Sequence, residues 1–557
     1  MIVINRAIDR VGDVNPQLFR ELKERLTLRN IGIASAIPLL IQSLTFLYFN
    51  TQLPPAPSYD FTYAHAYGVP KKLIDSFHKY CVGKFIEGDR DTPNFGRSDF
   101  CTLNSDGSYI IDWAEWWSGI CYNSGWIIFA VLILGSVYML VADLINEEKR
   151  GTMSFIRLSP RSPQQIFIGK ILGVPVLIYL AVAWMIPLHL LAGIKAGASL
   201  GMIASWYIAI GSCWFLLSSV AILYVLLGGV QAILTTIAVA TPIGLFFQGS
   251  SQRFNFKPGF SFDKGWFGLP LLGNSALTYI FESIVFIIIS YLVWQSLERR
   301  YLNPNTTAIS KPQSYLINIA LQIFILGFAV PFKYSLTSDE ASHCAALVAI
   351  DFTLLLLSIP LLLPSKQTLQ DWSRYRRERK NTQQRKFWQR ELVQDLLFND
   401  KSPALLSIAI NVGMVLLIWI PISLFFTVKF GVDGWRFLAC VCLGASLVLI
   451  YAAIAHLVLF LNVKKHNLWT MGIIAVVMTL PIGVALIMSP GGSPKGLAAF
   501  IFLFSPFAPA GVFGLSGEII FAAFTAQLAM LAVLTRQLQR KLQISGQSHS
   551  KELLARS

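Results

Sequence analysis

The chain has 557 residues, of which 54% are hydrophobic and only 13% are charged, and its formal net charge is +15. So little polar surface cannot cover a water-soluble globule of this size, which excludes a soluble protein. The basic balance is expected to reflect membrane topology and attraction to anionic lipid. Membrane lipids are therefore expected partners, and nucleic acid is not.

Apolar stretches long enough for a helix to cross roughly 30 Å of hydrocarbon recur along the chain. Twelve are predicted, near residues 32–49, 123–145, 171–193, 201–226, 230–248, 277–296, 316–332, 344–364, 404–427, 436–461, 468–488 and 517–537. The predicted fold is an all-α integral membrane protein. Most Lys and Arg residues fall on one side if the N-terminus is inside, which predicts that both termini are cytoplasmic.

Short sequence matches recur in the same order in the two halves of the chain. Ser-Pro occurs at 162–163 and 402–403, and Pro-Ile-Gly at 242–244 and 481–483. Such an internal repeat predicts two pseudo-equivalent six-helix halves. The predicted regions are a cytoplasmic amphipathic segment at 1–30, a first half at 31–300 with an external loop at 50–122, a second half at 301–540 with a basic cytoplasmic loop at 365–401, and a cytoplasmic tail at 541–557.

The N-terminal segment contains an amphipathic helix. Asn15 and Pro16 form an N-cap and first-turn pair, and Glu21 and Arg25 are spaced to pair on the polar face. The apolar face holds Leu18, Phe19, Leu22 and Leu26. This helix is expected on the cytoplasmic membrane surface, either as a topological anchor or as a lever that touches a cytoplasmic partner.

The segment from 146 to 170, NEEKRGTMSFIRLSPRSPQQIFIGK, joins the second and third predicted spans. Gly151 is expected to break the incoming helix, and Thr152 to cap a short new one that ends at Ser159-Pro160. A capping box at 162–165 then starts the third span. The short helix has the apolar residues Met153, Phe155, Ile156 and Leu158. An apolar helix offered to water is typical of a segment that docks in a groove of a soluble partner.

This segment resembles the cytoplasmic coupling segment of type 2 ABC exporter permeases. Their pattern runs Glu, Gly-Thr, a leucine-rich short helix, Pro, Ser and then Gly-Lys. The matching positions are Glu147 or Glu148, Arg150, Gly151, Thr152, Pro160, Ser162, Gly169 and Lys170. The first half also follows the family plan of a surface helix, six spans and a broken segment before the sixth.

The resemblance implies that the short helix docks on a nucleotide-binding subunit and transmits its ATP-driven closure to the membrane helices. The residues implied in this coupling are Glu148, Arg150, Gly151, Thr152, Met153, Phe155, Ile156 and Leu158. Family permeases commonly have six spans and dimerise, so twelve spans imply a fused pair. The implied location is a bacterial plasma (inner) membrane.

The second half departs from the family pattern, because its basic loop lacks the Gly-Thr and Gly-Lys elements. An equivalent helix is predicted before Ser402-Pro403, with Trp388 and Leu392 as coupling candidates among Phe387, Trp388, Leu392, Leu396 and Leu397. Either one ATPase site drives the halves asymmetrically, or this second loop binds only lipid headgroups.

ATP-binding motifs are missing from the sequence: it has neither a G-x-x-x-x-G-K-[ST] loop nor an ABC-type signature. The chain is therefore not expected to be an enzyme. No residues are predicted for catalysis, cofactor binding or metal binding, and ATP is expected to act through a partner subunit.

Charged residues inside predicted spans are candidates for a transport pathway, because a charge in hydrocarbon is costly. The candidates are Asp351, Glu282 and Glu518, with His189 and His456 as polar partners. In the external loop, Cys81 and Cys101 are expected to pair if the compartment is oxidising.

The predicted function is a permease subunit of an ABC transporter, an exporter of an amphiphilic, lipid-like or glycan substrate, powered by a separate ATPase. One alternative is an ion-coupled secondary transporter in which Asp351 is the coupled acid. The loop at 146–170 lacks the Gly, Asp and Arg pattern of the major facilitator group. Another alternative is a non-transporting membrane assembly protein or a membrane enzyme.

Overall fold

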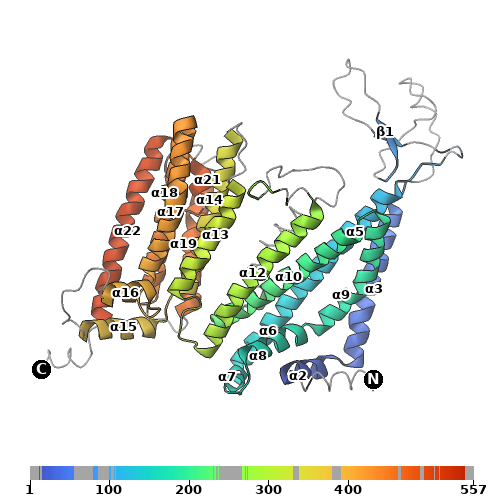
Figure 1. Ribbon diagram of the computed structural model, residues 1–557, viewed down its shortest axis with the longest axis horizontal. Helices are drawn as coiled ribbons and strands as arrows, with labels where there is room; N and C mark the ends of the chain where they lie inside the picture. Colours follow the sequence, from blue (N-terminus) through green and yellow to red (C-terminus); the bar gives the residue numbers. More distant parts are fainter. Residues whose placement is uncertain are drawn as a thin grey trace, which may run out of the picture. The chain divides into compact units, whose positions relative to one another are not determined.

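The computed structural model shows an almost entirely helical chain (Figure 1). It describes residues 12, 15–54, 80–85, 99–101, 104, 106, 108–229, 231–233, 236, 266–269, 271, 274–329, 338–378, 391–430, 432–461, 466–489, 495–506, 508–512 and 515–545. The chain divides into two compact units, and the last boundary between them falls within one helix, between Val293 and Trp294. Each unit is described by itself.

The first unit begins with the amphipathic helix and holds the first group of long apolar helices. Its elements are α2 (Pro16–Arg25), α3 (Leu28–Thr51), β1 (Gly83–Phe85), β2 (Asp99–Cys101), α5 (Trp113–Ala130), the π-helical turn η1 (Val131–Gly135), α6 (Ser136–Lys149), α7 (Thr152–Arg157), α8 (Pro163–Gly173), α9 (Val176–Lys195), α10 (Leu200–Leu226) and most of α12 (Ser275–Leu302). α3 packs on α9 and α5. Its large apolar side chains Leu40, Leu44 and Leu47 are more than half exposed, as expected of a helix whose outer face meets lipid.

The second unit packs its helices around one large apolar core. Its elements after α12 are α13 (Lys311–Ala329), α14 (Ser338–Leu362), α15 (Lys366–Glu378), α16 (Glu391–Phe398), α17 (Leu405–Phe430), α18 (Val432–Val458), α19 (His466–Met488), α20 (Leu497–Phe502), α21 (Ala508–Gly511) and α22 (Gly517–Ser545). α18 is the central helix, since it contacts α14, α17, α19, α21 and α22. Gly444 on α18 allows close packing, because a Cβ there would lie 2.4 Å from the ring of Phe352.

The described residues include nine helices long and apolar enough to cross a membrane. They correspond to nine of the twelve predicted spans. The eighth predicted span corresponds to α14, which forms a pair with α15 bent by 74°, and the eleventh to α19, whose apolar part covers Val476–Met488. The fifth, near 230–248, lies almost wholly outside the described residues. An all-α membrane protein is confirmed, while the count of twelve and the equivalence of the two halves remain predictions.

A small antiparallel hairpin stands in the predicted external loop. β1 pairs with β2 so that Gly83 faces Cys101. Cys81 forms a disulfide, whereas Cys121, Cys213, Cys440 and Cys442 are free thiols. The side chain of Cys101 lies outside the described residues, so its pairing with Cys81 stays a prediction.

Candidate functional site

The short helix α7 begins at a glycine whose backbone conformation favours this residue. Gly151 has a φ of +73°, and its amide donates to the Glu148 carbonyl at 3.1 Å, which ends α6 in a left-handed turn. The hydroxyl of Thr152 donates to the carbonyl oxygen of Glu147 at 3.0 Å. The prediction that Thr152 caps α7 is therefore wrong. Gly151 is the N-cap residue, and Thr152 fastens α7 to the end of α6.

The exposed apolar surface of α7 differs from the predicted one. Phe155 is 79% exposed and Leu158 is 84% exposed, whereas Met153 is buried and Ile156 is half-buried. The tip therefore consists of Phe155 and Leu158. The other predicted coupling residues Glu148, Arg150, Gly151 and Thr152 are exposed around it. The Ser159 hydroxyl donates to the Ile156 carbonyl at 2.7 Å and helps to end the helix, as predicted.

Helix α2 lies directly against α8, the helix that follows α7. Asn15 caps α2, as predicted, through its side-chain oxygen, and its Nδ2 donates to the Gln165 carbonyl on α8 at 2.7 Å. A Cβ at Gly169 would lie 2.9 Å from the Gln17 Cβ, and one at Gly173 would lie 2.5 Å from the Glu21 Cβ. Two glycines four residues apart thus form a groove into which α2 fits.

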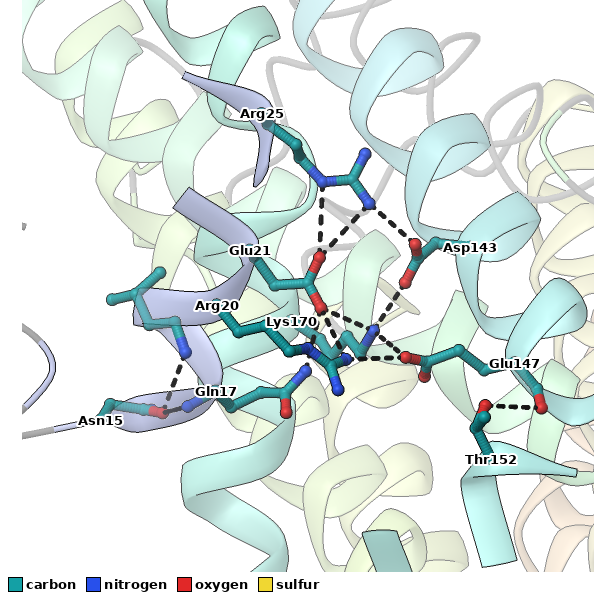
Figure 2. A network of polar contacts seen from close by, with 10 residues as sticks. Asn15, Gln17, Arg20, Glu21, Arg25, Asp143, Glu147, Thr152 and Lys170 are labelled. Carbon is teal, nitrogen blue, oxygen red and sulfur yellow. Dashed lines mark hydrogen bonds and ion pairs between the residues drawn. The ribbon is translucent and has the colours of Figure 1, made fainter. Parts of the chain in front are cut away.

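Beside this groove, Lys170 is the centre of an ionic cluster (Figure 2). Its Nζ lies 2.8 Å from Glu21 Oε1, 2.7 Å from Asp143 Oδ2 and 2.7 Å from Glu147 Oε1. Lys170 is 1% exposed and Glu21 is 2% exposed. The three acids come from two helices, α2 and α6, and the lysine comes from a third, α8.

Two arginines of α2 complete the cluster. Arg20 Nη2 lies 2.9 Å from Glu147 Oε1, and Arg25 Nη2 lies 2.7 Å from Asp143 Oδ1. Arg25 also contacts Glu21 at 3.3 Å, so the predicted pair at a four-residue spacing is confirmed. With three acids and three bases the cluster is neutral as a whole, which is how a buried group of charges becomes tolerable. We call these six residues the lysine cluster.

The electrostatics of the lysine cluster favour its charged form. Burial alone would lower the pKa of Lys170, but the carboxylates of Asp143, Glu147 and Glu21 outweigh it and raise that pKa above its ordinary value of 10.5. Burial alone would raise the pKa of Glu21, but Lys170 and the arginines outweigh it and lower that pKa below 4.5. Both shifts show that each ion is stabilised by its neighbours.

The acids of the lysine cluster are also spaced closely enough to hold a metal ion. Glu21, Asp143 and Glu147 are the one such group of acids, histidines or cysteines within the described residues. The Lys170 ammonium already lies within hydrogen-bond distance of all three. The lysine cluster thus connects α2, α6 and α8, and the Thr152 hydrogen bond connects α6 to α7.

The sequence analysis identified part of this site and missed part of it. Of the pair Glu147 or Glu148, it is Glu147 that binds Lys170, while Glu148 is exposed. Periodicity places Glu21 on the polar outer face of α2, yet it is buried against α8. Asp143 is absent from the predicted residues, although an acid four residues before Glu147 on the same helix face is a usable signal.

The predicted pathway residues are divided between the two units and differ in exposure. Asp351 is fully buried in the second unit, Glu282 is 4% exposed on the part of α12 that belongs to the first unit, and Glu518 is exposed in the first turn of α22. Glu518 is therefore not a buried intramembrane charge. It lies at a helix N-terminus, where a carboxylate is favourable.

Neither predicted histidine contacts these acids. His189 lies 2.8 Å from the Tyr207 hydroxyl and 3.6 Å from Cys121 Sγ. His456 Nε2 accepts from the Ala404 amide at 3.0 Å, and its Nδ1 lies 2.7 Å from the Ala452 carbonyl oxygen. A carbonyl can only accept, so His456 carries its proton on Nδ1.

In the second unit, α16 occupies the position of the predicted second coupling helix. Leu392 is 47% exposed, while Trp388 lies outside the described residues. Lys311 Nζ donates to the Leu396 carbonyl of α16 at 2.8 Å and also to the hydroxyl of Ser402. A cation at the end of a helix stabilises its last carbonyls. α16 is therefore fixed at its C-terminal end.

Comparison with models of known protein families, with curated proteins and with solved structures finds no match to this chain.

Proposed function

We propose that this chain is the permease subunit of an ABC transporter, powered by an ATPase on a separate subunit. The observation that carries the proposal is that one short segment has an exposed apolar tip and a base held by hydrogen bonding. The tip of α7 exposes Phe155 and Leu158 almost completely, while its base is fastened through Thr152 to the helix that contributes two acids to the lysine cluster.

Phe155 on α7 and Leu158 at its C-terminal cap contribute little to the stability of the isolated chain, because both side chains are exposed. Burial of such a side chain in a partner's groove is worth roughly 1.5–3 kcal/mol. The charged residues Glu148 and Arg150 beside the tip are exposed and suit the polar rim of such an interface. A soluble subunit with an apolar groove is the partner that this surface fits.

The lysine cluster provides a route by which movement of α7 could reach other helices. A force on the tip of α7 would pass through Thr152 to α6, and through Glu147 and Lys170 to α8 and α2. Because α2 is followed almost directly by the membrane helix α3, three membrane-directed helices would respond together. We propose that closure of the ATPase subunits is transmitted by this route and that the cargo is an amphiphilic, lipid-like or glycan substrate.

The test is co-purification from the native membrane of wild type and of the double variant Phe155→Asp/Leu158→Asp. Wild type is expected to retain a subunit with ATPase activity, and the variant is expected to lose it while inserting normally. Leu302→Asp is the matched control, since Leu302 is 65% exposed and lies on the same predicted side. Isolation of the wild type without an ATPase, or equal retention by the α7 variant, would count against the proposal.

An ion-coupled secondary transporter is the second candidate, and Asp351 is the observation that favours it. This acid is fully buried, and its partners in the described part of the chain are the neutral groups of Gln322 and Trp419. Wild-type protein that purifies without an ATPase, yet moves substrate when an ion gradient is imposed on vesicles, would favour this candidate.

A further inference from the structure

One face of α13 carries a row of buried polar side chains. Lys311, Ser314, Asn318 and Gln322 recur at spacings of three or four residues and are between 2% and 6% exposed. Such spacing places them on one helix face. Polar residues that point into a membrane-embedded bundle are costly and are commonly functional. We call these four residues the polar row.

The polar row is joined by hydrogen bonds to α17 and ends at Asp351 on α14. Gln322 Nε2 lies 2.8 and 2.9 Å from the two carboxyl oxygens of Asp351. Asn318 Nδ2 donates to the Asn411 carbonyl at 2.9 Å, and Asn411 Nδ2 donates to the Ser314 hydroxyl at 3.2 Å. Polar groups thus continue from the first residue of α13, at the predicted cytoplasmic side, to a carboxyl group inside the unit.

Asp351 has no cationic partner within the described residues. Its hydrogen bonds come from Gln322 and from Trp419 Nε1 at 3.1 Å, both of which are neutral. The helices packed against α14 are α13, α17, α18 and α21. Their ionisable residues are Lys311 and Tyr315 on α13, Lys429 on α17, and Asp433, Arg436, Cys440, Cys442, Tyr451 and His456 on α18. A carboxylate that is buried without a counter-ion is very costly, and binding a proton removes that cost.

Two side-chain amide oxygens along this series of polar groups can accept further hydrogen bonds. Gln322 Oε1 and Asn411 Oδ1 are buried acceptors to which no group among the described residues donates. A side-chain amide offers an acceptor beside its donor, so Gln322 can also receive a hydrogen bond from a carboxylic acid. Buried acceptors of this kind bind bridging water molecules, which exchange protons.

We propose that Asp351 is a proton-binding site, neutral in the resting protein, which exchanges its proton with the predicted cytoplasmic side along the polar row. This inference goes beyond the permease proposal, which depends on α7 and the lysine cluster in the other unit. The two are therefore tested by different residues and different measurements.

The experiment is infrared difference spectroscopy of the full chain in lipid at neutral pH. We expect a carboxylic-acid C=O band in wild type that is lost in Asp351→Asn and retained in Glu518→Gln, whose carboxyl is exposed. Loss of a carboxylate band in Asp351→Asn instead would overturn the assignment. On transfer to D2O, the Asp351 band is expected to shift more slowly in Asn318→Leu than in wild type. An unchanged rate would overturn the route.

Chemical labelling of the unmodified chain keeps the proposal testable if Asp351→Asn does not fold. A hydrophobic carbodiimide adds to a protonated carboxyl group, which gives up its proton to the reagent nitrogen as the new C–O bond forms. Peptide mapping by mass spectrometry is expected to locate the adduct on Asp351 at neutral pH. Labelling of other carboxyl groups but not of Asp351 would contradict the proposal.

Discussion

Replacing Lys170 with methionine should release α2 from α8. Methionine has a similar length but no charge, so Glu21, Asp143 and Glu147 would lose an ammonium group at 2.7–2.8 Å. Removing one partner from a buried ion pair costs about 3–5 kcal/mol, because it leaves charge buried without compensation. Since 1.4 kcal/mol is a factor of ten, the population with α2 undocked should rise by about a hundredfold to a few thousandfold.

Limited trypsin digestion of the solubilised protein measures this opening directly. The cleavable bonds after Arg20 and Lys23 lie within α2, and the bond after Arg25 lies at its end. Cleavage of a transiently opened segment follows the population of its open form. Lys149→Met is the matched control, because Lys149 is exposed at the end of α6.

A double variant tests the cause of the effect. Adding Glu21→Gln to Lys170→Met removes one of the uncompensated acids, so it should restore part of the protection and show a coupling between the two sites. If Lys170→Met resists trypsin as well as wild type does, or if the two changes simply add, the lysine cluster does not hold α2 and the reasoning is refuted.

Three further predictions concern the docking of α2 and the fixing of α16. Gly173→Ala should weaken α2 docking by about 1–3 kcal/mol through overpacking, seen as faster trypsin cleavage, whereas Gly32→Ala, with nothing within 4 Å of its Cβ, should not. Because the pKa of Glu21 is lowered, its stabilising contribution is present above pH 4.5 and lost as the pH falls further. The pKa of Lys170 is raised, so its contribution is present below pH 10.5 and lost above it. The rate of trypsin cleavage in α2, divided at each pH by the rate for an unstructured reference peptide, should thus be lowest between these values. Lys311→Met should expose α16 to protease at a cost of about 1–3 kcal/mol, since the C-terminal carbonyls lose their donor.

The spans were the most predictable part of the fold, because long apolar helices leave a strong signal in sequence. The end of α6 was predictable too, since Gly151 takes a left-handed conformation. Which face of α2 is buried could not be predicted. Glu21 belongs to the polar side of the helix by periodicity, and only tertiary contact decides that this side meets Lys170 instead of water.

The bend after α14 shows a second limit of sequence reasoning. α15 begins four residues after α14 ends, yet the two helices are bent by 74° relative to each other. The basic loop is expected to be cytoplasmic, and its helix α15 packs against α22, a contact that the sequence does not reveal. In the candidate site, likewise, the family resemblance singled out Gly169 and Lys170. Only the structure shows that Gly169 lines the groove for α2 and that Lys170 is the central cation of the lysine cluster.

The chemistry of the lysine cluster argues that it does more than hold helices together. A buried ion cluster can often be replaced by apolar residues with equal or greater stability. The triple variant Lys170→Met/Glu21→Met/Glu147→Met would keep the 2.7 Å pair of Arg25 and Asp143. We expect α2 to stay protected from trypsin, because the apolar side chains still fill the joint. We expect the partner's ATPase activity to lose its dependence on substrate, because directional contacts no longer fix the register of α2, α6 and α8. Retention of both properties would show that the cluster only fastens the helices, and loss of protection would show that the apolar joint does not pack.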